Sequence, residues 1–178
     1  MLKTDIIRRY PHLSDESGAA PQRIVVTVIA GILVSVSAWI ALIVLAPYLK
    51  STGSSWSSLV YAVFGPTCHQ IDSRCLHIFG FPMAVCARCL GIYLGFLVGT
   101  CLFPWLGPVP PRLPRPLTFV IFTLPIALDT SGNILGLWHT SSPLRLAIGI
   151  SWGLILPYYV VPGLVELLGR FPRIFRLK

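Results

Sequence analysis

The chain contains few charged residues, and this scarcity excludes an ordinary soluble domain. Charged side chains make up 11% of its 178 residues, and only six residues are acidic. Soluble domains carry about 25% charged residues. Hydrophobic residues make up 54% of the chain, and its mean hydropathy is +0.77. The composition therefore predicts an integral membrane protein.

The sequence also lacks the short signatures of several enzyme classes. It has no P-loop, no HExxH zinc motif and no dinucleotide-binding fingerprint. No motif names a reaction, so the chemistry has to be sought in clusters of side chains.

Four apolar segments are long enough to cross a membrane. They cover about residues 24–49, 85–106, 117–137 and 144–168. The first has no charged residue, and about 20 apolar residues suffice to cross a hydrocarbon core of about 30 Å. This first segment exceeds the roughly 7–15 residues of a signal-peptide core, and acidic residues precede it. We therefore expect a membrane helix there and not a cleaved signal.

These segments predict an all-α, polytopic membrane protein with four transmembrane helices. Between the first and second, residues 57–64 are apolar but too short to span, which favours an interfacial or re-entrant helix. Pro157 and Pro162 should bend the fourth helix, because each removes a backbone donor. We expect a cytoplasmic arm at residues 1–23, a transmembrane domain at 24–168 and a basic cytoplasmic tail at 169–178.

The placement of lysine and arginine predicts the orientation of the chain. Its net charge is +8, and ten of the 14 basic residues lie in the N-terminal arm, the proline-rich turn at 104–116 and the tail. The loops on the opposite side hold only Lys50 and Arg74. Because cytoplasmic loops are rich in lysine and arginine, both termini should be cytoplasmic in a protein of the inner (cytoplasmic) membrane. The basic tail then contacts lipid headgroups and is not a nucleic-acid site.

Four residues near the start of the second helix form a candidate metal site on the outer side. Cys68 and His69 are adjacent, and Cys86 and Cys89 form a CxxC pair. A set of three cysteines and one histidine suits tetrahedral zinc, and the CxxC spacing lets two thiolates chelate one ion. Because neighbouring residues are awkward joint ligands, the fourth ligand could instead come from a residue nearby. The candidates for that substitute are Cys75 and His77.

Other chemistries fit the same cysteines. The CxxC pair is also the motif of thiol-disulfide exchange, with Arg88 lowering the pKa of the neighbouring thiols and a quinone as the electron acceptor. A structural disulfide, or free thiols buried in the bundle, is the simplest alternative.

Three charged residues predict a polar pocket beside the cysteines. Asp129 lies about eight residues, or roughly 12 Å, below the outer end of the third helix, where an unpaired acid is costly. Arg88 and Arg145 begin the second and fourth helices at that same surface, so each is a candidate partner of Asp129. The pair could be purely structural. Alternatively, an arginine binds an anionic group and Asp129 handles protons, which makes these three the candidate catalytic residues.

The second helix has two different faces. At about 100° per residue, Cys86 and Cys89 share one face, whereas Gly91, Gly95 and Gly99 occupy the opposite one. Small residues spaced four apart let helices approach closely in lipid. We expect this glycine face to pack against another helix, and it is also the predicted surface for a homodimer.

Several motifs occur in order along the chain. They are Cys-His-Gln from residue 68, Val-Cys-Ala-Arg-Cys-Leu-Gly-Ile-Tyr-Leu-Gly from 85, Ala-Leu-Asp ending at 129 and Leu-Arg-Leu-Ala-Ile-Gly from 144. Together they resemble an uncharacterised family of small prokaryotic membrane proteins, domain of unknown function 2085, over about residues 61–153. The family has no cysteine where Cys75 stands, and the resemblance implies no reaction. It points to Cys68, His69, Gln70, Cys86, Arg88, Cys89, Gly91, Tyr93, Gly95, Asp129 and Arg145.

The sequence thus leaves three functions open. The first is a membrane protein with a zinc site at the outer end of its helix bundle. The second is a membrane thiol-disulfide oxidoreductase, and the third is an anion or lipid binder or transporter. We favour the first.

Overall fold

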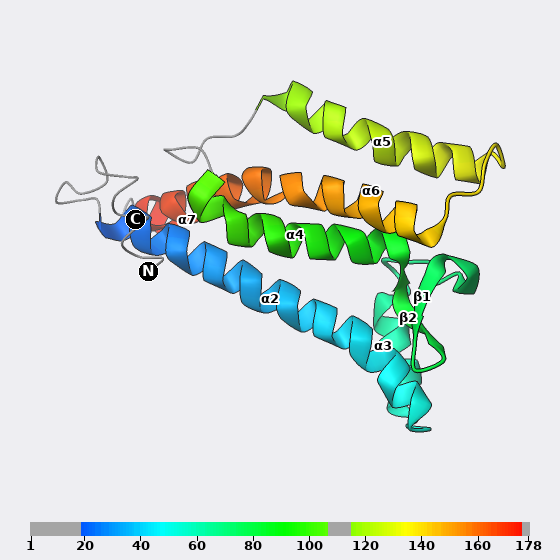
Figure 1. Ribbon diagram of the computed structural model, residues 1–178. Coiled ribbons are helices and arrows are strands. Elements are labelled where there is room, and N and C mark those ends of the chain that lie inside the picture. The colour runs from blue at the N-terminus through cyan, green and yellow to red at the C-terminus, as the bar shows by residue number, and fades with distance from the viewer. Residues whose placement is uncertain (1–18, 107–114, 176–178) are drawn as a thin grey trace.

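The computed structural model describes residues 19–106 and 115–175, and these residues form a bundle of long helices (Figure 1). Four helical segments are long and apolar enough to cross a membrane. This confirms the predicted number of spans and an essentially all-α membrane fold. The four segments are Arg23–Ser51, Ala87–Leu106, Pro116–Ile134 and Ser142–Leu168.

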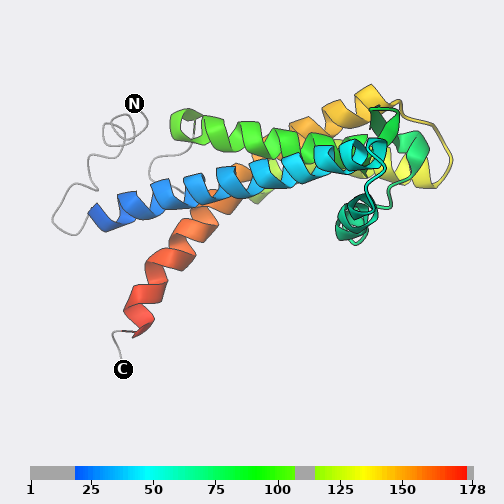
Figure 2. The ribbon, with the colours of Figure 1, turned by 90° about the horizontal axis from the view of Figure 1, so that it is seen from below.

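The helices begin and end close to the predicted boundaries. The first span lies in α2 (Ala19–Ser51), the second is α4 (Ala87–Leu106) and the third is α5 (Pro116–Ile134). The fourth span is divided into α6 (Ser142–Ile155) and α7 (Pro157–Phe175). Figure 2 shows α7 turning away from the direction of α6. The predicted bend therefore occurs at Pro157, where proline cannot continue the backbone hydrogen bonds.

Contact between glycines joins α4 to α6. A Cβ atom placed on Gly91 would come within 3.1 Å of the Cα atom of Gly149, and one on Gly95 would come within 3.0 Å of the Cα atom of Gly153. Backbones can approach this closely only where there is no side chain, as expected for small-xxx-small repeats in membranes. The glycine face thus packs within the chain, as predicted. A homodimer would have to use another surface, because α6 already covers Gly91, Gly95 and Gly99.

The connection between α2 and α4 contains more structure than the sequence predicted. The expected short helix is present as α3 (Trp56–Phe64), followed by the 3-10 turn η2 (Asp72–Arg74). Two antiparallel strands that we did not predict follow, β1 (Cys75–Ile78) and β2 (Phe81–Cys86). The predicted start of the second helix at residue 85 was therefore early, since residues 85 and 86 belong to β2.

The turn between the strands explains why this segment forms a hairpin. Phe79 and Gly80 both have positive φ angles, 57° and 80°. Two such residues in succession are typical of the tight turns that join antiparallel strands. Cys75 then pairs with Cys86 at the other end of the ladder, so the hairpin fixes where β2 ends and α4 begins.

The two ends of the bundle differ in structure. The start of α2, the end of α4 and the end of α7 lie at one end, whereas α3, the hairpin and the turn between α5 and α6 lie at the other (Figure 1). A buried hydrophobic cluster stabilises this second end. Trp39 of α2 packs edge-on against Phe64 of α3, with their ring centroids 4.7 Å apart. The cluster consists of Ile43, Ala46, Phe64, Cys68, Met83, Ala84, Val85 and Leu90.

Candidate functional site

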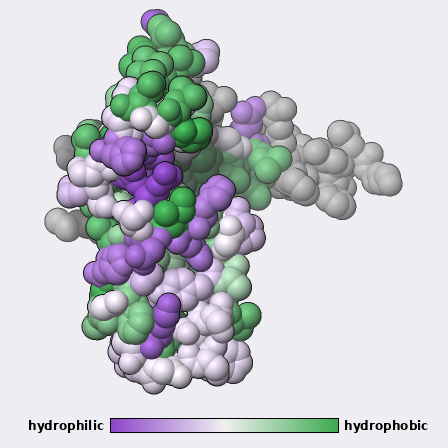
Figure 3. All heavy atoms as spheres, turned by 90° about the vertical axis from the view of Figure 1, so that its right-hand side faces the viewer, coloured by the Kyte–Doolittle hydropathy of each residue, from purple (hydrophilic) through white to green (hydrophobic). Residues whose placement is uncertain are grey.

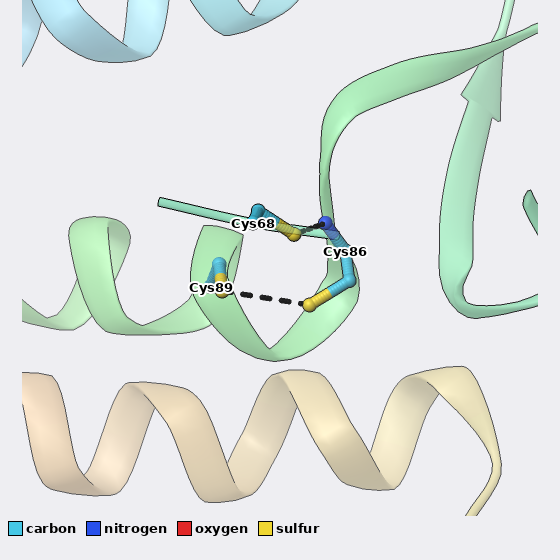
Figure 4. Close-up of side chains that lie close together, drawn as sticks. All are labelled: Cys68, Cys86 and Cys89. Carbon is cyan, nitrogen blue, oxygen red and sulfur yellow. Dashed lines mark hydrogen bonds between the residues drawn. The ribbon is translucent and has the colours of Figure 1, made fainter. Parts of the chain in front are cut away.

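Three of the predicted metal ligands converge at the hairpin end. The sulfur atoms of Cys68, Cys86 and Cys89 all lie within 4.8 Å of one another. The sulfurs of Cys86 and Cys89 are 3.5 Å apart, and the backbone N–H of Cys86 donates to the sulfur of Cys68 at 3.2 Å (Figure 4). All three thiols are free.

Local structure brings these cysteines together from three elements. Cys86 is the last residue of β2, and Cys89 lies in the first turn of α4. Cys68 follows α3, in a segment held by Gln70, whose side-chain amide donates to the carbonyl oxygen of Tyr61 at 2.7 Å. Gln70 itself has a φ angle of 51°, which is uncommon for a residue other than glycine. The backbone is thus bent at the point where it presents Cys68 to the CxxC pair.

The surroundings of Cys68 favour its thiolate form. Cys68 is only 7% exposed. Hydrogen bonds from the thiols of Cys86 and Cys89, together with those from the backbone amides of Cys86 and Gln70, lower the pKa of the Cys68 thiol. A thiolate is the form that binds metals and attacks disulfides, so the cluster is prepared for either chemistry.

The other candidate ligands do not join this group. His69 is exposed, and its ring nitrogens lie outside the set of ligand atoms within 4.8 Å. His77 is paired with Asp72 at 3.2 Å on the exposed side of the hairpin. Burial, followed by the negative charges of nearby groups, raises the pKa of the Cys75 thiol to about 12 and so keeps it protonated. Among the described residues, the group of close ligand atoms thus contains three of the four predicted ligands, Cys68, Cys86 and Cys89, without His69.

The predicted Asp129 cluster forms between α4, α5 and the loop after α5. The carboxylate of Asp129 forms an ion pair with Arg88 and accepts a hydrogen bond from the hydroxyl of Thr140. The side-chain amide of Asn133, one turn further along α5, donates to the same carboxylate at 3.1 Å and to the hydroxyl of Thr140 at 2.8 Å. Of the two predicted partners, Arg88 is thus the one that pairs with Asp129.

The second predicted partner, Arg145, lies beside this cluster without an ion pair. It is 7% exposed, and its Nη2 atom donates to the side-chain oxygen of Asn133 at 2.7 Å. The Nε atoms of both Arg145 and Arg88 are buried and have no hydrogen-bond partner. Arg145 therefore forms no ion pair with Asp129, and its hydrogen-bonded connection to that carboxylate runs through Asn133.

One cavity joins the thiols to the charged cluster. Its volume is about 350 Å³. From the hairpin end of the molecule, hydrophilic residues gather in the middle of the surface (Figure 3). The residues that line the cavity are Thr67, Cys68, His69, Gln70, Ile71, Arg74, Cys86, Arg88, Cys89, Thr130, Asn133, Ile134 and Arg145.

Comparison with known proteins assigns the chain to a family. The family model described as "Predicted membrane protein (DUF2085)" matches residues 68–159. The chain belongs to the DUF2085 family. It is 35% identical over 144 residues to an uncharacterized protein of Methanocaldococcus jannaschii, a match that covers 77% of this chain and 92% of that protein. No solved structure matches the chain.

A second relative is more distant. An uncharacterized protein of Methanothermobacter thermautotrophicus is 29% identical over 87 residues, covering 49% of this chain and 78% of that protein. The DUF2085 segment begins at Cys68 and includes both the thiol cluster and the Asp129 cluster, whereas α2 and α3 precede it. Both clusters therefore lie within the family's segment, and among the residues that line the cavity Thr67 alone precedes it.

Sequence reasoning missed two contributors to the site of this DUF2085 protein. Thr140 lies in the loop after α5, outside the four predicted membrane segments, although it hydrogen-bonds Asp129. Arg74 was counted only as a loop charge, although it lines the cavity. A hydroxyl directly beyond a helix that carries a buried acid was the available signal for Thr140. No sequence signal indicated that Arg74 would line the cavity, because its position depends on the fold of η2 and the hairpin.

Proposed function

We propose that this protein holds a zinc ion on the thiolates of Cys68, Cys86 and Cys89, at one end of a multi-pass membrane bundle. The observation that carries this proposal is the convergence of three sulfur atoms within 4.8 Å. Tetrahedral zinc with zinc-sulfur bonds of about 2.3 Å needs sulfurs about 3.8 Å apart. The three cysteines therefore need only small movements to become ligands.

The groups around the sulfurs fit the same proposal. The backbone N–H of Cys86 points at the sulfur of Cys68, and hydrogen bonds of this kind orient metal ligands and adjust their basicity. Three protein ligands leave the fourth position of a tetrahedral ion for water or another ligand, which is the pattern of catalytic zinc sites. A zinc ion bound there would supply Lewis acidity or a bound water of lowered pKa.

The residues of the adjoining cluster would serve the site by binding and positioning. Asp129 receives hydrogen bonds from Thr140 and Asn133 as well as the ion pair with Arg88. A carboxylate engaged on this many sides is better suited to fixing Arg88 than to carrying protons. Arg88 and Arg145 then present their guanidinium groups to the cavity beside the thiols.

We place the site on the outer face of the cytoplasmic membrane, with both termini in the cytoplasm. Ten basic residues in the arm, the proline-rich turn and the tail, against Lys50 and Arg74 in the opposite loops, support this orientation. In the fold, the end of β2 and the start of α4, which carry Cys86 and Cys89, lie at the end opposite the start of α2 and the end of α7 (Figure 1).

The second candidate function, thiol-disulfide exchange, is favoured by one specific contact. The sulfurs of Cys86 and Cys89 are 3.5 Å apart, and a disulfide requires them to close to about 2.05 Å. Oxidation would remove two electrons and two protons from this pair, for which a membrane quinone is a suitable acceptor. It would also remove two of the three zinc ligands, so the two functions exclude each other in one molecule.

Metal analysis of the purified full-length protein tests the proposal. We expect about one zinc ion per chain in the wild type, and at least a tenfold lower content in Cys68→Ser, Cys86→Ser and Cys89→Ser. Cys101→Ser is the matched control, because Cys101 is exposed on α4 and lies outside the cluster. Thiol alkylation should be blocked at the three cysteines until a chelator is added.

Two results would contradict the zinc proposal. One is wild-type protein without metal, in which mass spectrometry finds a reducible disulfide between Cys86 and Cys89; this result supports thiol exchange. The other is Cys68→Ser protein that retains the wild-type zinc content, since two sulfurs cannot provide the proposed site.

A further inference from the structure

Arg145 carries a buried positive charge without a negative partner. It is 7% exposed, and its Nε atom is buried without a hydrogen-bond partner. Within residues 19–106 and 115–175, no ion pair involves this side chain. A buried charge is strongly unfavourable unless it is paired, and here it stands in the first turn of a membrane-spanning helix.

Positive charge exceeds negative charge throughout the cavity. Arg74, Arg88 and Arg145 all line it. The acid beside them, Asp129, is already paired with Arg88. If zinc is bound, three thiolates and one ion together add a single negative charge, which still leaves the site positive. The excess therefore remains with or without metal.

The size and position of the cavity indicate the class of anion. A volume of about 350 Å³ accommodates a group larger than a halide or a water cluster. Guanidinium groups form paired hydrogen bonds with phosphate oxygens, and several such groups around one cavity suit a tetrahedral oxyanion with many acceptors. The cavity is also lined by residues at the ends of three membrane-spanning helices, namely Arg88 at the start of α4, Asn133 at the end of α5 and Arg145 at the start of α6. The ends of such helices are where a membrane protein meets lipid headgroups.

We propose that this cavity binds a phosphate group, which receives hydrogen bonds from Arg145 and is held electrostatically by Arg88 and Arg74. The phosphate belongs to a lipid headgroup or to a soluble phosphate compound, and the chemistry of recognition is the same for both. This inference rests on the unpaired guanidinium of Arg145 and not on the proposed zinc ion.

Thermal unfolding with defined anions tests the inference. The full-length protein in a phosphate-free maltoside detergent is titrated with sodium phosphate, against sodium chloride at equal ionic strength, and separately with short-chain phosphatidylglycerol. We expect the Tm of the wild type to rise with at least one probe. Arg145→Gln should bind that probe at least tenfold more weakly, since a hydrogen bond to a charged group is lost. Arg145→Lys, which keeps the charge but not the paired donors, should fall in between.

The controls separate binding from folding. Arg115→Gln is the matched variant, because Arg115 is exposed and lies at the start of α5, at the opposite end of the bundle. It should bind as the wild type does. Without any probe, Arg145→Gln should have a Tm equal to or above that of the wild type, because it no longer buries an unpaired charge. Its zinc content should be unchanged, so that loss of phosphate binding and loss of metal are distinguishable.

The outcomes have distinct meanings. Stabilisation by inorganic phosphate supports a soluble phosphate compound, and stabilisation by phosphatidylglycerol alone supports a lipid headgroup. The inference is overturned if neither probe raises the Tm of the wild type, or if Arg145→Gln responds to the probes as strongly as the wild type does.

Discussion

Asp129→Asn should destabilise the protein much more than the same change at a surface carboxylate. The side chains of Asp129 and Arg88 are 7% and 17% exposed, respectively, and they form the ion pair between α5 and α4. Asparagine keeps the shape and can still accept a hydrogen bond from Thr140. It removes the only negative charge that Arg88 contacts among the residues the structure describes.

The magnitude follows from the burial of the pair. Removing one partner of a buried ion pair costs about 3–5 kcal/mol, because the other charge stays buried and unpaired. We expect a value near the lower end, about 3 kcal/mol, since Arg88 keeps some contact with its surroundings. An ordinary hydrogen bond between membrane helices contributes only about 0.6 kcal/mol on average. The matched control, Asp72→Asn, should change stability by less than about 1 kcal/mol, because Asp72 is 75% exposed beside His77.

Equilibrium unfolding with sodium dodecyl sulfate in mixed micelles, followed by tryptophan fluorescence, measures both values. Arg88→Gln combined with Asp129→Asn should recover part of the loss, with a coupling energy of at least about 1 kcal/mol, because neither charge is then left alone. The reasoning is wrong if Asp129→Asn lies within about 0.5 kcal/mol of Asp72→Asn, or if the two changes are simply additive.

Two further predictions concern packing and orientation. Gly91→Ala should destabilise the bundle by about 1–3 kcal/mol in the same unfolding assay, because a Cβ atom at this position meets the backbone of α6. The control variant Gly31→Ala should be close to neutral, because nothing lies within 4 Å of its Cβ position. Equal effects of the two substitutions would refute the glycine contact. A cysteine introduced as Thr52→Cys, in the exposed loop after α2, should react with a membrane-impermeant maleimide in intact cells, whereas native Cys101 should not. If the Thr52→Cys variant is labelled only after the cells are lysed, the orientation is the opposite of the proposed one.

The number and positions of the membrane-spanning helices were predictable because the thickness of the bilayer determines their length and composition. Runs of about 20 apolar residues fix the helices whatever their neighbours are, and the break at Pro157 follows from the chemistry of proline. The hairpin was missed for a local reason. Residues 75–86 are largely apolar and lack the alternation of polar and apolar residues that marks a half-buried strand, and the predicted second span already includes residues 85 and 86. Only the Phe79-Gly80 pair, with its positive φ angles, marks the turn.

The candidate site was predictable where short spacing along the chain or membrane depth determines position, although Cys86 belongs to β2 and not to the second helix as predicted. The CxxC spacing places Cys86 and Cys89 together, and the cost of burying Asp129 predicts its pairing with an arginine. The contribution of Cys68 without His69 depends on the irregular backbone after α3. No periodic pattern describes such a segment, so the sequence could not distinguish which of the two neighbours turns inward.

The peripheral position of α5 gives the Asp129 cluster a mechanical consequence. Backbone contact between the glycines of α4 and α6 makes those two helices one rigid unit, which carries Arg88 and Arg145 at a fixed spacing. By contrast, α5 is largely exposed and lies along one side of the bundle (Figure 1), and Asp129 is the acid that ties the half of α5 at the hairpin end to that unit. A ligand that draws Arg88 away from Asp129 would therefore also loosen this end of α5, which would then be held to α6 by the hydrogen bond from Arg145 to Asn133, so that occupancy of the cavity is coupled to the seating of a transmembrane helix.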